Sequence, residues 1–150
     1  MLERHVDEGD RIRIVTHNDS DGVAAGGIIS KAISRLGVGF KTTTEKRVDE
    51  KTVKAIASEK PPLVIFSDLG SGYLDVFKEH LAGTDIIVLD HHLPIELEIE
   101  NIAHINPLLN DLDGARGISG AGVSYLFARE ISKKNVDLST LGIVGALADQ

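Results

Sequence analysis

The segment IVTHNDSDG, residues 14–22, places three potential metal ligands directly after an apolar run. The run RIRIVTH (11–17) has the composition of a buried strand. In an extended chain alternate side chains share one side, so we expect His17, Asp19 and Asp21 to point together. The residues between them would point away. The segment therefore predicts a strand that ends in imidazole and carboxylate ligands.

The rest of the chain alternates short apolar runs with helix-period segments, which is typical of βαβ units. Runs such as LVIF and IIVL are apolar on both faces, as expected for central parallel strands covered by helices on each side. The sequence thus predicts a Rossmann-like α/β sandwich of three layers around a five-stranded, mainly parallel sheet. The predicted strands are 11–17, 39–45, 63–68, 85–92 and 102–107, and helices are expected near 73–82, 120–134 and 138–149.

Two further helices have recognisable ends. The first is expected to end at Gly37, and the second to start at a capping Asp49 and to stop before the prolines at 61–62. Their predicted inner faces carry Val23, Ile29, Ala32, Ile33 and Leu36 in the first helix and Val53, Ile56 and Ala57 in the second.

Composition limits the classes of protein and site. The chain has 150 residues, 42% of them hydrophobic, which suits one globular domain spanning 1–150. It contains no cysteine, so disulfides and thiolate metal sites are excluded and a cytoplasmic location is expected. The charged opening MLERHVDEGDR does not resemble a signal peptide, and no apolar run approaches the roughly 20 residues that cross a bilayer, so no membrane contact is expected. The net charge of −7 disfavours nucleic-acid binding through a general basic surface.

Potential ligands follow three of the predicted strands. In an open parallel sheet the carboxyl ends of the strands line one crevice, where ligands usually bind. We therefore expect these side chains to converge from separate parts of the sequence. They are His17, Asp19 and Asp21 after the first strand, Asp68 after the third, and Asp90, His91 and His92 after the fourth.

Other motif classes fit poorly. An EF-hand loop counted from His17 would need Glu at its twelfth position, where Ile28 stands. GSGYLD puts Asp75 where a dinucleotide fingerprint needs its last glycine, and neither a P-loop nor a G-x-S-x-G elbow is present. Taken singly, each short motif is also explained by an ordinary turn, a helix cap or a surface histidine. His5, His80 and His104 lack acidic neighbours of this kind and are interpreted as structural or surface residues.

Four motifs in order, HNDSDG, SDLG, DHH and GALAD, make the chain resemble the DHH phosphoesterase family. INP at 105–107 and SGAGVSYLFA at 119–128 resemble the segment that follows the DHH motif in RecJ-like nucleases. Within the family, the first motif and its flanks are most similar to archaeal RecJ-like single-strand nucleases.

The resemblance implies a site with two divalent ions. Oxygen and imidazole ligands without sulfur suit Mn²⁺ or Mg²⁺, and histidine favours Mn²⁺. By match to the family motifs, Asp90 orients an imidazole, and His92 contacts phosphate or protonates the leaving group. The implied ligands are His17, Asp19 and Asp68 for one ion and Asp21, Asp68, His91 and Asp149 for the other.

The segment GARGISGAG (114–122) offers a possible phosphate site. Backbone amides at the start of a helix near Ser119 and Gly120 can receive phosphate oxygens, and Arg116 could add a bidentate contact. A loop with Ser119 as a helix cap explains the same residues. Lys46 and Arg47, after the second predicted strand, could contact a nucleic-acid backbone, but isolated basic pairs usually face solvent and they are interpreted in that way.

The sequence therefore predicts a metal-dependent phosphodiesterase, most like a single-strand exonuclease of DNA or RNA processing or repair. One alternative is hydrolysis of short oligonucleotides or cyclic dinucleotides. Another is a non-catalytic DHH-like scaffold that binds replication or repair proteins, although all the expected carboxylates are present. Because the chain stops one residue after Asp149, it is expected to be the catalytic part of a longer protein whose C-terminal substrate-binding domain is missing.

Overall fold

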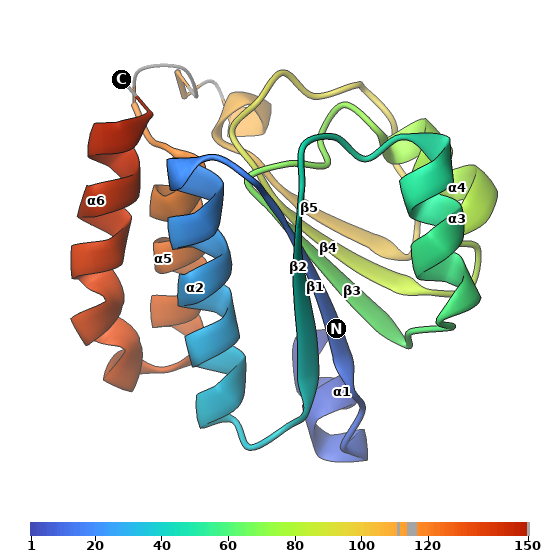
Figure 1. The fold of residues 1–150 in the computed structure, drawn as a ribbon, viewed down its shortest axis with the longest axis horizontal. Coiled ribbons are helices and arrows are strands. Elements are labelled where there is room, and N and C mark those ends of the chain that lie inside the picture. Colours follow the sequence, from blue (N-terminus) through green and yellow to red (C-terminus); the bar gives the residue numbers. More distant parts are fainter. Residues whose placement is uncertain (111, 114–116, 150) are drawn as a thin grey trace.

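The protein is an α/β sandwich built on a five-stranded sheet with the order β2-β1-β3-β4-β5 (Figure 1). The computed structural model describes residues 1–110, 112–113 and 117–149. Every neighbouring pair of strands is parallel, which confirms the predicted fold class. The strands are β1 (Ile12–His17), β2 (Phe40–Glu45), β3 (Leu63–Ser67), β4 (Asp85–Leu89) and β5 (Ile102–Ile105).

Helices cover both faces of the sheet (Figure 1). The helices α2, α5 and α6 pack together on one face, and α3 and α4 lie on the other. The described helices are α1 (Leu2–Glu8), α2 (Ser20–Arg35), α3 (Glu50–Ser58), α4 (Leu74–His80), α5 (Gly120–Ile131) and α6 (Ser139–Ala148), with 3₁₀ turns at Pro107–Asn110 and Lys133–Leu138.

The central strands are buried because helices cover both of their faces. All residues of β3 are buried, and β4 is buried apart from its first residue. On the α3 and α4 side, Phe66 stacks on Phe77 with ring centroids 4.3 Å apart. The edge strand β2 is largely exposed, which matches its run of threonines.

Two details of the predicted helices are wrong. Asp49 does cap α3, since its carboxylate accepts the amide of Thr52 at 3.0 Å. However, Val23 is 55% exposed, because α2 begins at Ser20 and turns Ala24 and Ile28 inward instead. The helix predicted at 120–134 ends at Ile131, where a 3₁₀ turn begins a tight connection into α6.

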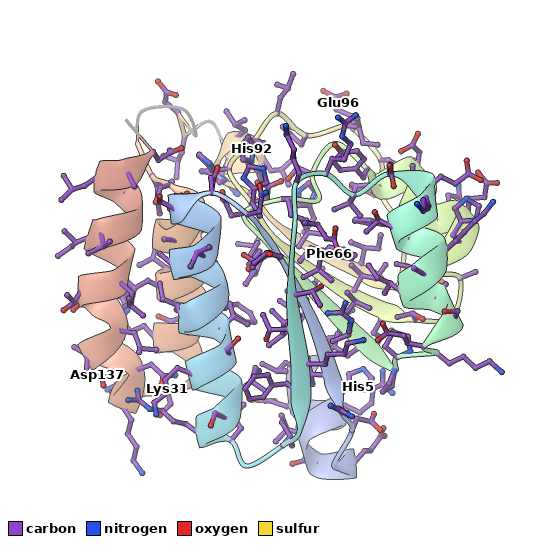
Figure 2. All side chains as sticks on the ribbon, viewed as in Figure 1. His5, Lys31, Phe66, His92, Glu96 and Asp137 are labelled. Carbon is purple, nitrogen blue, oxygen red and sulfur yellow. The ribbon has the colours of Figure 1, made fainter. Side chains whose placement is uncertain are left out.

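Helix α1 was not expected from the sequence, because it is short and polar. It is held by His5, which is 2% exposed and lies between two carboxylates. Nδ1 of His5 is 2.7 Å from Asp10, and Nε2 is 3.0 Å from Asp85. The interpretation of His5 as lacking acidic neighbours is therefore wrong, since β4 brings Asp85 to it. Figure 2 places His5 and His92 at opposite ends of the sheet.

Residues 90–101 cross from β4 to β5 without a helix or strand of their own. Ile95, Leu97 and Ile99 of this segment pack against the core on the α3 and α4 side. The alternating apolar residues thus cover the sheet where a crossover helix lies in its other connections. Within the part of the chain that the structure describes, no helix is long and apolar enough to cross a bilayer.

Candidate metal centre

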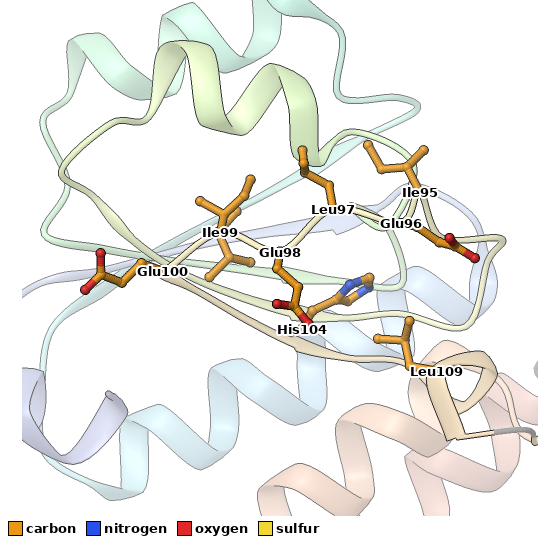
Figure 3. Close-up of a pocket in the computed structure, with 9 residues that line it drawn as sticks. Ile95, Glu96, Leu97, Glu98, Ile99, Glu100, His104 and Leu109 are labelled. Carbon is orange, nitrogen blue, oxygen red and sulfur yellow. The ribbon is translucent and has the colours of Figure 1, made fainter.

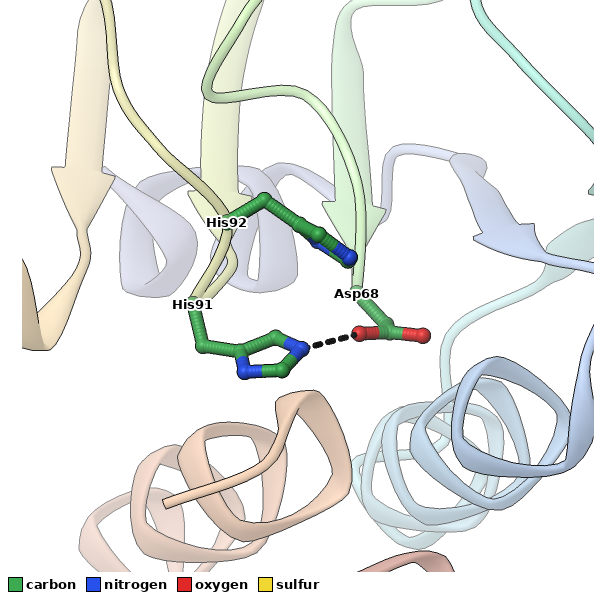
Figure 4. Close-up of side chains that lie close together, drawn as sticks. All are labelled: Asp68, His91 and His92. Atoms are coloured by element: carbon green, nitrogen blue, oxygen red, sulfur yellow. Dashed lines mark ion pairs between the residues drawn. The ribbon is translucent and has the colours of Figure 1, made fainter. Parts of the chain in front are cut away.

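The carboxyl ends of β1, β3 and β4 bring their polar residues together, as the strand-end argument predicts. His17 ends β1, Asp68 directly follows β3, and His91 and His92 follow β4. Figure 4 shows the imidazoles of His91 and His92 converging on the Asp68 carboxylate from a different strand end. Side chains far apart in the sequence therefore form one centre.

One group of ligand atoms consists of His17, Asp19 and Asp68. One atom from each side chain lies within 4.8 Å of the others. Nδ1 of His17 is 2.6 Å from Oδ2 of Asp19 and 3.8 Å from Oδ2 of Asp68. An imidazole nitrogen and two carboxylate oxygens at this separation can share a divalent cation.

A second group consists of Asp21, His91 and Asp149, again with one ligand atom each within 4.8 Å. Nε2 of His91 is 3.9 Å from Asp21, and its Nδ1 is 3.9 Å from Asp149. Asp149 stands at the C-terminal end of α6, so three separate elements build this group. Nε2 of His91 is also 3.3 Å from Oδ1 of Asp68, which connects the two groups.

Asp68 lies between the two groups and is unusual in its burial, its backbone conformation and its pKa. It is 1% exposed, no backbone amide of the described residues donates to its carboxylate, and its nearest donor is Nε2 of His91, 3.3 Å from Oδ1. Its φ of 58° is in the left-handed region, which a non-glycine residue rarely adopts outside constrained sites. Burial, together with the charges of Asp21 and Asp19, raises the pKa of this carboxyl to about 7, although the His91 imidazole opposes the shift. A buried carboxylate that lacks backbone donors and faces imidazoles fits a bridging metal ligand.

Asp21 reaches the centre by a route that the sequence did not predict. It lies in the first turn of α2 rather than in an extended continuation of β1. Its carboxylate accepts the amide of Gly120 at 2.7 Å and that of Ala121 at 3.1 Å. The positive N-terminal end of α5 therefore faces Asp21 and supports its charge.

These hydrogen bonds bear on the expected phosphate site. The amides of Gly120 and Ala121 are occupied by Asp21, and Oγ of Ser119 accepts the amide of Gly122 at 3.2 Å as a helix cap. The geometry thus matches the capping alternative for Ser119, while a phosphate role stays a prediction. Arg116 lies outside the described residues.

Two glycines permit the close packing around the carboxylates. A Cβ on Gly120 would lie 2.1 Å from Oδ1 of Asp68, and one on Gly145 would lie 2.5 Å from Oδ1 of Asp21. Neither contact is possible for a real side chain. Helices α5 and α6 therefore need glycine where they pass the centre.

Asp90 and His92 form a hydrogen-bonded pair, and His92 also groups with Asp68 and His91 as candidate ligands. Asp90 is 1% exposed, and its Oδ1 lies 2.7 Å from Nδ1 of His92. Burial acts to raise the pKa of Asp90, but hydrogen bonds from His92 and from the Ser71 amide prevail and hold it at about 2. The same bond raises the pKa of His92. With Nδ1 bound to Asp90, Nε2 of His92 is left for other partners.

A cleft of about 470 Å³ opens beside the centre and is lined by His17, Asp68 and His92. Lys46 and Arg47 stand on the same cleft, so their interpretation as a pair that only faces solvent is incomplete. They directly follow β2, and the strand-end argument applied to this strand would have placed them here. Tyr73 adds an aromatic ring to the wall.

The arrangement defines a class of protein, a parallel α/β domain with a carboxylate and imidazole centre at its strand ends. The chain matches the DHH family, N-terminal domain, over residues 11–145, and it belongs to that family. It is 38% identical to the uncharacterized protein MJ0831 of Methanocaldococcus jannaschii over 92% of this chain and 32% of that protein.

It is also similar to the single-stranded-DNA-specific exonuclease RecJ of Thermus thermophilus, with 25% identity over 99% of this chain and 24% of that protein. The structure of Thermus thermophilus RecJ in complex with Mn²⁺ superposes with a TM-score of 0.80 and 26% identity, and it covers 99% of this chain and 23% of that one. The chain thus spans about a third or less of the length of these relatives. The RecJ likeness agrees with the family match and with the fold of the domain.

Proposed function

We propose that the chain is the catalytic domain of a two-metal phosphodiesterase that acts on single-stranded nucleic acid. The observation that carries the proposal is the placement of Asp68. Its Oδ2 faces the group of His17 and Asp19, whereas its Oδ1 faces His91 of the second group. One buried carboxylate between two donor sets is the arrangement that a pair of divalent ions requires.

The residues present fit such ions. His17, Asp19 and Asp68 would hold one, and Asp21, Asp68, His91 and Asp149 would hold the other. Mn²⁺ suits the imidazole content, and Mg²⁺ is the second choice. When bound, the ions supply positive charge that neutralises a phosphodiester and lowers the pKa of water.

The remaining side chains position the substrate and a proton. His92, held by Asp90 at Nδ1, presents Nε2 to the cleft, where it can donate to a phosphate oxygen or to the leaving oxygen. Lys46 and Arg47 can contact the flanking phosphates. The chain as a whole is acidic, with a net charge of −7, so we expect a polymer to be held through the cleft rather than through a broad surface.

The test is hydrolysis with Mn²⁺, Mg²⁺ or chelator, using end-labelled single strands of DNA and RNA, duplexes, dinucleotides and cyclic dinucleotides. We expect Mn²⁺-dependent cleavage of single strands and loss of cleavage in Asp68→Asn. Faster cleavage of dinucleotides or cyclic dinucleotides would assign that alternative substrate. Hydrolysis of none of them by a chain that binds Mn²⁺ would refute the enzyme proposal and favour a scaffold that binds replication or repair proteins. Cytoplasmic location and a further substrate-binding domain stay predictions.

A further inference from the structure

The two histidines of the centre stand on a segment without regular structure. Residues 90–101 contain no helix or strand, and the backbone pairing of β4 with β5 ends just before the histidines, where the Asp90 amide donates to the Ile105 carbonyl at 3.1 Å. The position of His91 and His92 must come from hydrogen bonds made by neighbouring elements. Two buried polar residues outside the candidate ligand set contribute such bonds, Ser71 through its backbone and Asn106 through its side chain.

Ser71 lies between β3 and α4 and ties the segment at two points. It is 0% exposed. Its amide donates to Oδ2 of Asp90 at 2.9 Å, and its carbonyl accepts the amide of Ile95 at 3.0 Å. The stretch that carries both histidines is therefore bound to the loop after Asp68 on each side.

Asn106 follows β5 and holds the stretch between these two points. It is 2% exposed, and its Nδ2 donates to the carbonyl of His92 at 2.9 Å and to Oγ of Ser71 at 2.8 Å. Its Oδ1 accepts the amide of Leu108 at 2.9 Å. A carbonyl can only accept and an amide can only donate, so these partners fix the orientation of the Asn106 side chain.

The Ser71 hydroxyl also contacts His104. Its Oγ accepts from Asn106 and lies 2.8 Å from Nε2 of His104, to which it can donate when that ring carries its proton on Nδ1. Burial lowers the pKa of His104, which agrees with a neutral ring that accepts at Nε2. His104 lines a cavity of about 940 Å³. Figure 3 shows His104 on β5 beneath the segment 95–100. Oγ of Ser71 and both polar side-chain atoms of Asn106 have partners in this chain of contacts.

We propose that Asn106 and Ser71 are positioning residues that set the orientation of the His92 imidazole, a role that rests on the proposed function. Asn106 fixes the carbonyl of His92, and Ser71 fixes the carboxylate that binds Nδ1 of the same residue. Without Asn106, the backbone of the stretch can turn, and the ring no longer keeps Nε2 toward the cleft. His91, on the same stretch, shifts with it, which weakens metal binding.

The test is Asn106→Ala in the full chain of 150 residues, without metal and then with Mn²⁺. In long-range ¹H–¹⁵N spectra we expect the wild-type His92 ring to carry its proton on Nδ1 and the variant ring to show averaged nitrogen shifts. By calorimetry we expect the variant to bind Mn²⁺ about 10- to 100-fold more weakly. Ser71→Ala should change both readouts in the same direction, because it removes the hydroxyl that accepts from Nδ2 of Asn106. The hydrogen bond from the backbone amide of residue 71 to Asp90 remains in this variant.

The matched control is Asn135→Ala, which also removes a buried asparagine. Asn135 is 0% exposed, donates to the carbonyl of Ala128 at 2.8 Å and accepts from Arg35 at 2.9 Å, near the C-terminal end of α5. We expect it to lower stability without changing the His92 shifts or the Mn²⁺ affinity. If Asn106→Ala matches this control in both readouts, the positioning role is refuted and Asn106 only supports the fold.

Failure of the positioning role and failure of the proposed function can be told apart. The ¹⁵N shifts are measured without metal or substrate, and they decide whether Asn106 orients His92. Failure of the wild-type chain to hydrolyse any phosphodiester would refute the proposed function, whereas unchanged shifts in Asn106→Ala would refute the positioning role alone.

Discussion

Asp68→Asn should stabilise the metal-free chain at high pH, the reverse of the usual effect of changing a buried residue. In the folded chain the pKa of Asp68 is about 7, against an ordinary 3.8. The folded state therefore holds this proton more tightly, so the free energy of unfolding falls as the pH rises from about 4 to about 7. The difference of about 3 pKa units corresponds to roughly 4 kcal/mol when the carboxyl is ionised. An uncharged Asn removes this cost.

The assay is urea unfolding followed by circular dichroism in chelator, since the chain has no tryptophan. At about pH 8 we expect Asp68→Asn to exceed the wild type by about 1 to 4 kcal/mol, and near pH 4 we expect the difference to vanish because both side chains are neutral. With Mn²⁺ at 100 times its Kd the wild type should gain about 2.7 kcal/mol, and the variant should gain much less. The difference in free energy of unfolding between Asp68→Asn and the wild type should therefore become smaller or change sign.

Two controls isolate the charge of Asp68. Asp7→Asn makes the same change in net charge at an exposed position, and it should leave the pH profile unchanged. Asp68→Ala also removes the charge, but at a φ of 58° Ala is less tolerated than Asn, so it should be about 1 kcal/mol less stable than Asp68→Asn. If Asp68→Asn is less stable than the wild type in chelator at every pH, other groups of the folded chain stabilise the ionised Asp68 carboxylate. The predicted destabilisation by its charge is then refuted.

Three further results are expected. His5→Ala should lower the free energy of unfolding by about 2 kcal/mol in urea, because it removes the buried imidazole that lies between Asp10 and Asp85; a change close to zero would contradict the role of His5 in holding α1. Glu59→Ala should cost about 1 kcal/mol, since it removes the carboxylate 3.1 Å from the buried Arg13. Lys41 and Arg13 lower the pKa of Glu59, so this contribution should be present above pH 4.5 and disappear as the pH falls further, and a constant cost would refute it. Mn²⁺ should raise the melting temperature and chelator should reverse the rise, whereas a melting curve insensitive to both would argue against a preformed centre.

The strands and their common edge could be predicted because burial on both faces leaves a strong mark in the sequence. LVIF and IIVL became the cores of β3 and β4, and the ligands after them met as expected. Helix α1 could not be predicted in the same way. Its seven residues are mostly polar, and its stability depends on Asp85, which lies 80 positions from His5. Local patterns carry no information on such a contact.

The site was predictable in its residue types but not in its hydrogen bonds. A glycine-rich helix start offers amides to any acceptor, and the sequence does not tell a phosphate from a carboxylate of the same chain. The folded chain places Asp21 on the amides of Gly120 and Ala121. The left-handed backbone of Asp68 left no mark either, because the following Leu69-Gly70 is compatible with many turns.

The carboxylates of the centre differ in the number of backbone amides that donate to them, and this difference sets Asp68 apart. Asp19 accepts the amide of Gly22, Asp21 accepts two amides of α5, and Asp90 accepts three amides besides the His92 ring. Their negative charges are therefore supported by the backbone before any cation arrives. Asp68 has no such donor among the described residues and also adopts a strained backbone. The missing backbone donors and the strained backbone both belong to Asp68, the residue that faces both ligand groups. Cation binding should therefore contribute more free energy through Asp68 than through any other carboxylate of the centre. Measured Mn²⁺ affinities should accordingly fall further in Asp68→Asn than in Asp19→Asn, and the opposite order would show that the backbone, rather than the cation, supports the Asp68 charge.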